Sequence, residues 1–302
     1  MEFDDYQREA EKTDQMLSGA DGKRELVNVI VPLLGLAGET GEILSEYKKF
    51  LRDGPAHKLF KARLVEELGD LLWYLSSAAA KFDISLEEVA HANLAKCRAR
   101  WEAITSSQMS LGLPRPSFDS GYPLGERLPR KRTIEFATVE TPQGLRTLIT
   151  SAGEQFGNEL SDNRDEADGY RFHDVFHLAY AAVLGWSPIT RKFFNAKRRS
   201  DARVDEVQDG GRATVIEEGI AALIFSYAEQ HEFLEGLESV DYDLLRTIAV
   251  MTSHLEVSAR SAGQWEDAIL QGFAVWRRVK AANSGRVVID LDQAKISFLT
   301  ES

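Results

Sequence analysis

Cysteine is nearly absent from this sequence. Its 302 residues include one thiol, Cys97. A single cysteine excludes a disulfide framework and a cysteine-based zinc site. It suits a reducing compartment, so we expect a cytoplasmic protein. The first residues, MEFDDYQREAEK, are acidic and polar, and they lack the apolar stretch of a secretory signal peptide.

Long apolar runs and an excess of positive charge are also missing. No uninterrupted apolar run approaches about 18 residues, so we expect no membrane span. The chain carries 36 Lys and Arg against 48 Asp and Glu, a net charge of −12. This balance argues against a broad nucleic-acid surface. A polyphosphate can still bind an acidic protein where a metal ion and a few basic side chains supply positive charge locally.

Proline is scarce and unevenly placed. Four of the eight prolines fall in residues 106–132, together with several glycines. This composition predicts a connector between two domains, residues 1–105 and 133–302. A chain of this length suits one large or two ordinary domains.

Residues 1–105 carry apolar side chains at helical spacing. We expect helices over residues 4–16, 25–52, 58–82 and 85–101, with a break near Pro32 in the second. Amphipathic helices joined by short turns predict a helical bundle.

Residues 133–302 combine helical and alternating patterns. Alternation predicts strands over residues 133–139, 287–291 and 295–299, with the last two forming a hairpin. A small antiparallel sheet would then join the start and end of this domain. We expect helices over residues 145–160, 170–184, 211–234, 242–258 and 264–282. The predicted fold is mainly α: an N-terminal helical bundle plus a second, mainly α domain with a small antiparallel sheet.

Two pairs of acids stand out in the first domain. Glu39 and Glu42 lie in GLAGETGEILSEYKK, and Glu67 and Asp70 lie in LVEELGDLLWYL. The i, i+3 spacing puts each pair on one face of its helix. Two such helices packed antiparallel would gather four oxygen ligands, too much negative charge to bury without a cation. The alternative is four solvated acids, but the glycines beside them leave room for a ligand and favour a metal site.

The ordered pattern E-x-x-E, 24 residues, E-x-x-D resembles the MazG-type all-α nucleoside triphosphate pyrophosphohydrolases. The resemblance runs from FDDYQREAEKT to ISLEEVAHANLAKCRARW, about a third of the chain. It implies that Glu39, Glu42, Glu67 and Asp70 hold Mg²⁺, with Mn²⁺ as a substitute. Water would then convert an NTP or dNTP, non-standard nucleotides included, to a monophosphate and pyrophosphate.

The same resemblance extends to substrate and partners. It implies that Asn93 and Lys96 contact the nucleotide, and that the bundle pairs with another protomer in a homo-oligomer or with its own second domain. Residues 133–302 resemble the C-terminal domain fused to some MazG-like proteins. The rival hypothesis is a regulatory protein that senses a nucleotide or binds nucleic acid or protein, with the bundle as a scaffold. The four intact acids argue against that rival.

The second domain contains two further groups of charged residues. His173, Asp174 and His177 have metal-ligand spacing on one predicted helix, and Glu217 and Glu218 lie in a segment that weakly repeats the EELGD helix. Ala221 replaces the aspartate there, so a magnesium site of the first kind is not expected. Buried histidines hydrogen-bonded to carboxylates are common structural features, and we favour that interpretation over a second metal site. The basic residues 197–199 and Arg203 are interpreted as a solvated charge run rather than a phosphate site.

Overall fold

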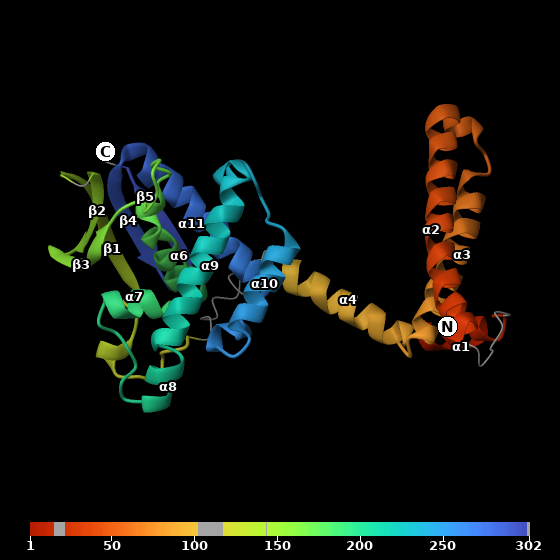
Figure 1. Cartoon of the computed structure of the whole chain (residues 1–302), viewed down its shortest axis with the longest axis horizontal. Helices are drawn as coiled ribbons and strands as arrows, with labels where there is room; N and C mark the ends of the chain where they lie inside the picture. The colour runs from red at the N-terminus through yellow and green to blue at the C-terminus, as the bar shows by residue number, and fades with distance from the viewer. Residues whose placement is uncertain (15–21, 102–116, 143, 301–302) are drawn as a thin grey trace. The chain divides into compact units, whose positions relative to one another are not determined.

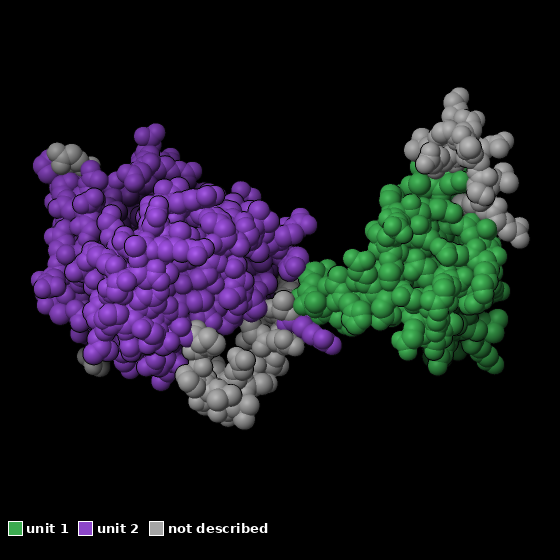
Figure 2. Space-filling model, turned by 90° about the horizontal axis from the view of Figure 1, so that it is seen from below, with its two compact units in different colours: residues 1–97 green, residues 98–302 purple. Residues whose placement is uncertain are grey.

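A computed structural model of the chain describes residues 1–14, 22–101, 117–142 and 144–300. Contacts within the chain divide it into two compact units, residues 1–97 and 98–302 (Figure 2). The mainly α fold with a small antiparallel sheet is confirmed. Residues 102–116, which include part of the expected connector, lie outside the described residues.

The first unit is built from helices. They are α1 (Phe3–Glu11), α2 (Gly22–Asp53), α3 (Phe60–Lys81) and α4 (Leu86–Trp101), with a short 3₁₀ turn, η1 (Gly54–Ala56), between α2 and α3. Helices α2 and α3 lie side by side in a hairpin (Figure 1). Aromatic rings near the turn stack, with Phe50 and Phe60 centroids 4.4 Å apart. Thr13 accepts a hydrogen bond from Trp73 Nε1 at 2.7 Å, which ties the end of α1 to α3.

The break expected at Pro32 is wrong, because α2 runs through this residue without interruption. A proline removes one backbone hydrogen bond. Pro32 is buried, and the helix packs along its length against α3, so tertiary contacts outweigh the local cost. The part of the predicted helix 4–16 beyond residue 14 lies outside the described residues.

The second unit has a five-stranded antiparallel sheet in the order β3-β2-β1-β4-β5. Its strands are β1 (Lys131–Thr141), β2 (Gly144–Ser151), β3 (Glu154–Leu160), β4 (Ser284–Asp290) and β5 (Lys295–Leu299). The predicted strands and hairpin are confirmed, and the pairing of β1 with β4 joins the start and end of the unit.

Helices cover one face of this sheet (Figure 1). Helix α6 (Asp174–Leu184) and α11 (Ala262–Ala282) pack on β4 and β5, and α9 (Gly211–Glu229) and α10 (Tyr242–Thr252) lie beyond them. The shorter α7 (Pro188–Phe193) and α8 (Ala202–Val207) connect α6 to α9. Every residue of α6 is buried, which is typical of a helix at the centre of a core.

The helix expected over residues 145–160 is wrong, because β2 and β3 occupy this segment. Burial along β2 alternates, with Thr147, Ile149 and Ser151 pointing inward. Ala152 and Gly153 both have positive φ, at 51° and 82°. Two such residues form the tight turn whose twist suits a hairpin. The alternation of buried and more exposed side chains along β2, with a period of two residues, is typical of a strand and not of a helix.

Residues 117–130, at the end of the expected connector, pack on the second unit. The Leu128 side chain is buried in that core, and its backbone N–H donates to Asp119 Oδ2 at 2.8 Å. Asp119 in turn accepts from the buried Arg191 at 3.0 Å. A buried ion pair thus fastens this segment to α7.

Candidate active site

Helices α2 and α3 contact each other along stripes that alternate spacings of three and four residues. The buried or half-buried positions with this spacing include 36, 39, 43, 46 and 50 on α2 and 64, 67, 71, 74 and 78 on α3. Such stripes normally carry apolar side chains at a helix–helix contact. Here Glu39 and Glu67 take apolar positions near the middle of the two stripes. Packing of the hairpin therefore holds two carboxylates face to face.

Three of the four predicted acids come together. Carboxylate oxygens of Glu39, Glu67 and Asp70 lie within 4.8 Å of one another. Glu39 and Glu67 are half-buried, and Asp70 is exposed. Glu42 is exposed and lies outside this group, but its charge still acts on Glu67.

Electrostatic repulsion marks this cluster. Partial burial raises the pKa of Glu67 above its ordinary value, and the carboxylates of Glu39 and Glu42 raise it further. Like charges held this close disfavour the ionised form. A divalent cation would remove this repulsion, and an all-oxygen donor set with exposed edges is the kind that Mg²⁺ and Mn²⁺ bind.

Open space adjoins the acids. A Cβ atom added at Gly38, Gly41 or Gly69 would meet no atom within 4 Å, whereas one at Gly35 would fall 2.3 Å from the Tyr74 ring. The glycines in GETGE and EELGD therefore border free volume, and Gly35 serves the packing of α2 on α3. The exposed side of the acid cluster is the side of Asp70 and Glu42.

Neighbouring residues have structural partners. Glu46 is buried and pairs with Lys49 and with His57 Nε2 at 3.0 Å. Glu66 is exposed and pairs with Arg63 at 2.9 Å. Tyr74 packs on Gly35.

The predicted nucleotide contacts lie on a separate helix. Asn93 and Lys96 are both exposed on α4, and Asn93 Oδ1 accepts from Cys97 Sγ at 3.4 Å. They do not belong to the group formed by Glu39, Glu67 and Asp70.

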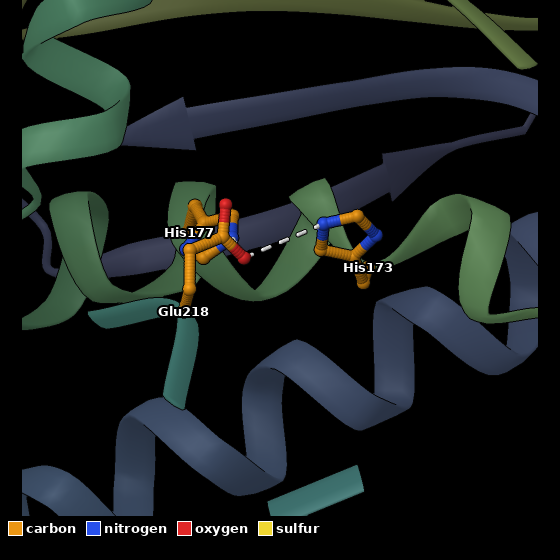
Figure 3. Close-up of side chains that lie close together, drawn as sticks. All are labelled: His173, His177 and Glu218. Carbon is orange, nitrogen blue, oxygen red and sulfur yellow. Dashed lines mark ion pairs between the residues drawn. The ribbon is translucent and has the colours of Figure 1, made fainter. Parts of the chain in front are cut away.

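A second cluster lies in the core of the other unit. His173 and His177, at the start of α6, face Glu218 on α9 (Figure 3). Asp174 lies beside both imidazoles, and the buried Glu217 contacts His177 Nδ1 at 3.0 Å. The sequence identified all five residues, and the expected hydrogen bond between a buried histidine and a carboxylate is present in His177 and Glu217, whereas Glu218 is exposed.

The basic segment 197–199 is not solvated throughout, because its central residue is buried. Arg198 is 1% exposed and pairs with Asp209 and Glu256, each at 2.7 Å. Burial opposes its charge, but these two carboxylates raise the pKa of Arg198 overall. Lys197 pairs with Asp205 at 2.8 Å. The prediction failed for Arg198 because one of its carboxylate partners, Glu256, lies 58 residues away in the sequence.

Comparison with known proteins identifies the family of this chain. The profile of the MazG C-terminal domain matches residues 114–302, and that of the MazG nucleotide pyrophosphohydrolase domain matches residues 31–105. The chain therefore belongs to the MazG family, with a nucleotide pyrophosphohydrolase domain followed by a MazG C-terminal domain. It is 35% identical over 102 residues to the Gene 37 protein of Mycobacterium phage L5, covering 33% of this chain and 89% of the phage protein. No solved structure matches.

Proposed function

We propose that the first unit hydrolyses nucleoside triphosphates to nucleoside monophosphates and pyrophosphate, with Mg²⁺ as cofactor and Mn²⁺ as a substitute. The observation that carries this proposal is the convergence of Glu39, Glu67 and Asp70 within 4.8 Å on two packed helices. The pyrophosphohydrolase profile that matches these residues supports it.

The chain's own residues have separate tasks in this reaction. Glu39, Glu67 and Asp70 would hold the cation, and Glu42 would complete the set from the exposed side. Bound there, Mg²⁺ supplies positive charge to the triphosphate and makes a coordinated water more acidic. The exposed side of the cluster, at Asp70 and Glu42, would admit the substrate. Asn93 and Lys96, exposed on α4, are proposed to contact the nucleotide.

The reaction breaks the anhydride between the α and β phosphates. Water adds to the α phosphorus, and pyrophosphate leaves with the bridging oxygen. The substrate range is an NTP or dNTP, including non-standard or surplus nucleotides. A regulatory protein that merely senses nucleotides has no need for the repulsive acid cluster, which costs stability when no cation is bound.

We also propose that the unit acts as a homo-oligomer. An apolar stripe on the side of α2 away from α3 is exposed, with Leu34 at 65%, Leu44 at 64% and Leu51 at 68%. Val27, Ile30 and Leu34 have alternating spacings of three and four, and Leu44 and Leu51 lie seven residues apart on the same side of the helix, a pattern that suits contact with another helix. The segment Val27–Ala56, which lies mostly in α2, contains an 18-residue stretch with mean hydropathy 1.4 and is long and apolar enough to cross a membrane. Glu39 and Glu42 in the middle of that segment favour a protein partner over lipid.

Product analysis tests the proposed reaction. The full-length protein is incubated with a panel of NTPs and dNTPs and Mg²⁺, and products are resolved by phosphorus NMR. Monophosphate and pyrophosphate in equal amounts are expected, with none formed in excess chelator. Diphosphate and orthophosphate as main products would overturn the proposal, as would no turnover of any nucleotide.

A further inference from the structure

The two imidazoles on α6 are each held through one ring nitrogen. His177 Nδ1 donates to Glu217 Oε1 at 3.0 Å, and Glu217 also accepts from Ser187 Oγ at 2.6 Å and from the Ile189 N–H at 2.9 Å. His173 Nδ1 donates to the Tyr170 carbonyl at 2.8 Å, and its ring stacks on Tyr170 with centroids 4.4 Å apart. Each Nε2 is therefore the free nitrogen of its ring.

The other nitrogen of His177 lies within ion-pair distance of Glu218 but makes no hydrogen bond. Its side chain is fully buried, and Nε2 makes no hydrogen bond. Glu218 Oε2 lies 3.4 Å away, without hydrogen-bond geometry, and Asp174 Oδ1 lies 4.0 Å away. A buried polar atom left in this way costs free energy and calls for an explanation.

The second imidazole points at the same oxygens. His173 Nε2 lies 3.7 Å from Glu218 Oε2 and 3.8 Å from Asp174 Oδ1. These separations are too long for hydrogen bonds. Ligands about 2.0–2.2 Å from a tetrahedral Zn²⁺ lie roughly 3.3–3.6 Å apart. The donor atoms therefore surround a space of about the size that such an ion needs.

Charge favours a cation in that space. Three carboxyl groups adjoin the two imidazoles, those of Asp174, Glu217 and Glu218. A metal ion would balance the negative charge of these carboxyl groups, and it can bind both imidazoles and Glu218 at once.

We propose that the second unit binds a divalent transition-metal ion, Zn²⁺ or one of similar preference, through His173 Nε2, His177 Nε2 and Glu218, with Asp174 beside it as a further oxygen donor. Imidazole ligands favour such ions over Mg²⁺. Glu217 and the Tyr170 carbonyl accept hydrogen bonds from the Nδ1 atoms of His177 and His173 and so fix the orientation of the two rings, as is usual for metal-binding histidines.

One side of this site is open. The Glu218 side chain is 47% exposed, whereas those of His173, Asp174 and His177 are 10% exposed or less. Two histidines and one glutamate with an accessible position form the donor set of catalytic rather than closed structural zinc sites. The ion can therefore accept an anionic ligand, such as a phosphate or carboxylate group, from the Glu218 side.

Cobalt binding tests this proposal in the full-length protein. The protein is stripped with a chelator and titrated with Co²⁺, whose visible spectrum distinguishes four- or five-coordinate nitrogen–oxygen sites from six-coordinate oxygen sites. One equivalent with the lower-coordinate spectrum is expected, with release of protons at neutral pH and displacement by Zn²⁺. Glu67→Gln in the first unit should leave this spectrum unchanged.

Variants assign the ligands. Glu218→Gln, at a half-exposed position that is safe for folding, should weaken binding at least tenfold, and His177→Ala should abolish it. His254→Ala, an exposed histidine of the same unit, should bind as the wild type does. The proposal is overturned if the wild type shows only the six-coordinate spectrum or if Glu218→Gln binds as tightly as His254→Ala. A folded, metal-free protein with His177 as an imidazolium would be the explanation in that case.

Discussion

At the scale of the residue, Glu67 takes a position where helix packing favours an apolar side chain. Its carboxylate lies close to those of Glu39 and Asp70. In the absence of a cation this arrangement opposes folding of the first unit, because the native state raises the pKa of Glu67. Function and stability therefore make opposite demands at this residue.

Glu67→Gln is expected to stabilise the metal-free protein and to destroy activity. The raised pKa means that the folded state binds a proton more tightly than the unfolded chain does. Stability from this group is therefore present at low pH and is lost as pH rises from the ordinary glutamate value through the raised pKa. Glutamine removes that loss. Thermal unfolding in chelator should show a higher midpoint for the variant at pH 7 and little difference at pH 4.

Added Mg²⁺ should reverse the order of the thermal midpoints of the wild type and Glu67→Gln. The cation binds only the folded wild type and so raises its midpoint, but it should leave Glu67→Gln nearly unchanged. A variant that is less stable than the wild type in chelator at pH 7 would contradict the repulsion described here.

Spacing along the sequence was enough to find the acids, because i, i+3 pairs on a helix need no tertiary information. The same reasoning could not decide the environment of Arg198 or His177. Both are buried through contacts between segments far apart in the chain, Arg198 with Glu256 and His177 with Glu217. A histidine beside acids in sequence is compatible with a surface or a core position.

At the scale of the element, the contact between α2 and α3 depends on Gly35. A methyl group there would lie 2.3 Å from the Tyr74 ring, so the ring or the helix must move. Gly35→Ala should destabilise the first unit by about 1–3 kcal/mol, as overpacking does. Gly38→Ala on the same helix meets open space and should stabilise it by about 0.5–1 kcal/mol through helix propensity. Urea unfolding followed by circular dichroism measures both, and equal midpoints would refute the close contact.

Elements with a clear period were predictable, and those with mixed signals were not. The strand over residues 295–299 matches β5, because alternation and the following hairpin partner agree. Residues 145–160 contain leucines and acids that also fit a helix, and the tight turn at Ala152-Gly153 decided between the two. Helix α2 differs in this respect. Pro32 favours a break in the helix, but the packing of α2 against α3 keeps the helix continuous.

At the scale of the whole molecule, the two units divide the proposed chemistry. The first presents oxygen donors for a hard cation, and the second presents imidazoles for a softer one. A fragment ending near Leu128 would carry part of the second core with it, because Leu128 is buried there. The better place to separate the units lies between residues 97 and 117. That boundary depends on the tertiary contacts of residues 117–130, which composition alone did not reveal.

The exposed stripe on α2 predicts the oligomeric state. Leu44→Lys places a charge in the proposed helix–helix contact and should shift the full-length protein to a smaller species. Val250→Lys is the control, since Val250 is 70% exposed on α10 of the second unit. Light scattering after size-exclusion chromatography reports the mass of each. A monomeric wild type, or identical masses for all three proteins, would contradict assembly through this stripe.

The central claim is that the acid cluster of the first unit performs pyrophosphohydrolysis. The most direct measurement is pyrophosphate release at saturating Mg²⁺ by Glu39→Gln, Glu67→Gln and Asp70→Asn beside Glu66→Gln. Glu66 is adjacent in sequence but exposed and paired with Arg63, so it serves as the matched control. We expect the three cluster variants to lose about 100-fold or more in turnover while remaining folded, and Glu66→Gln to stay within about twofold of the wild type. Near-normal turnover in any cluster variant, or an equal loss in Glu66→Gln, would contradict the account.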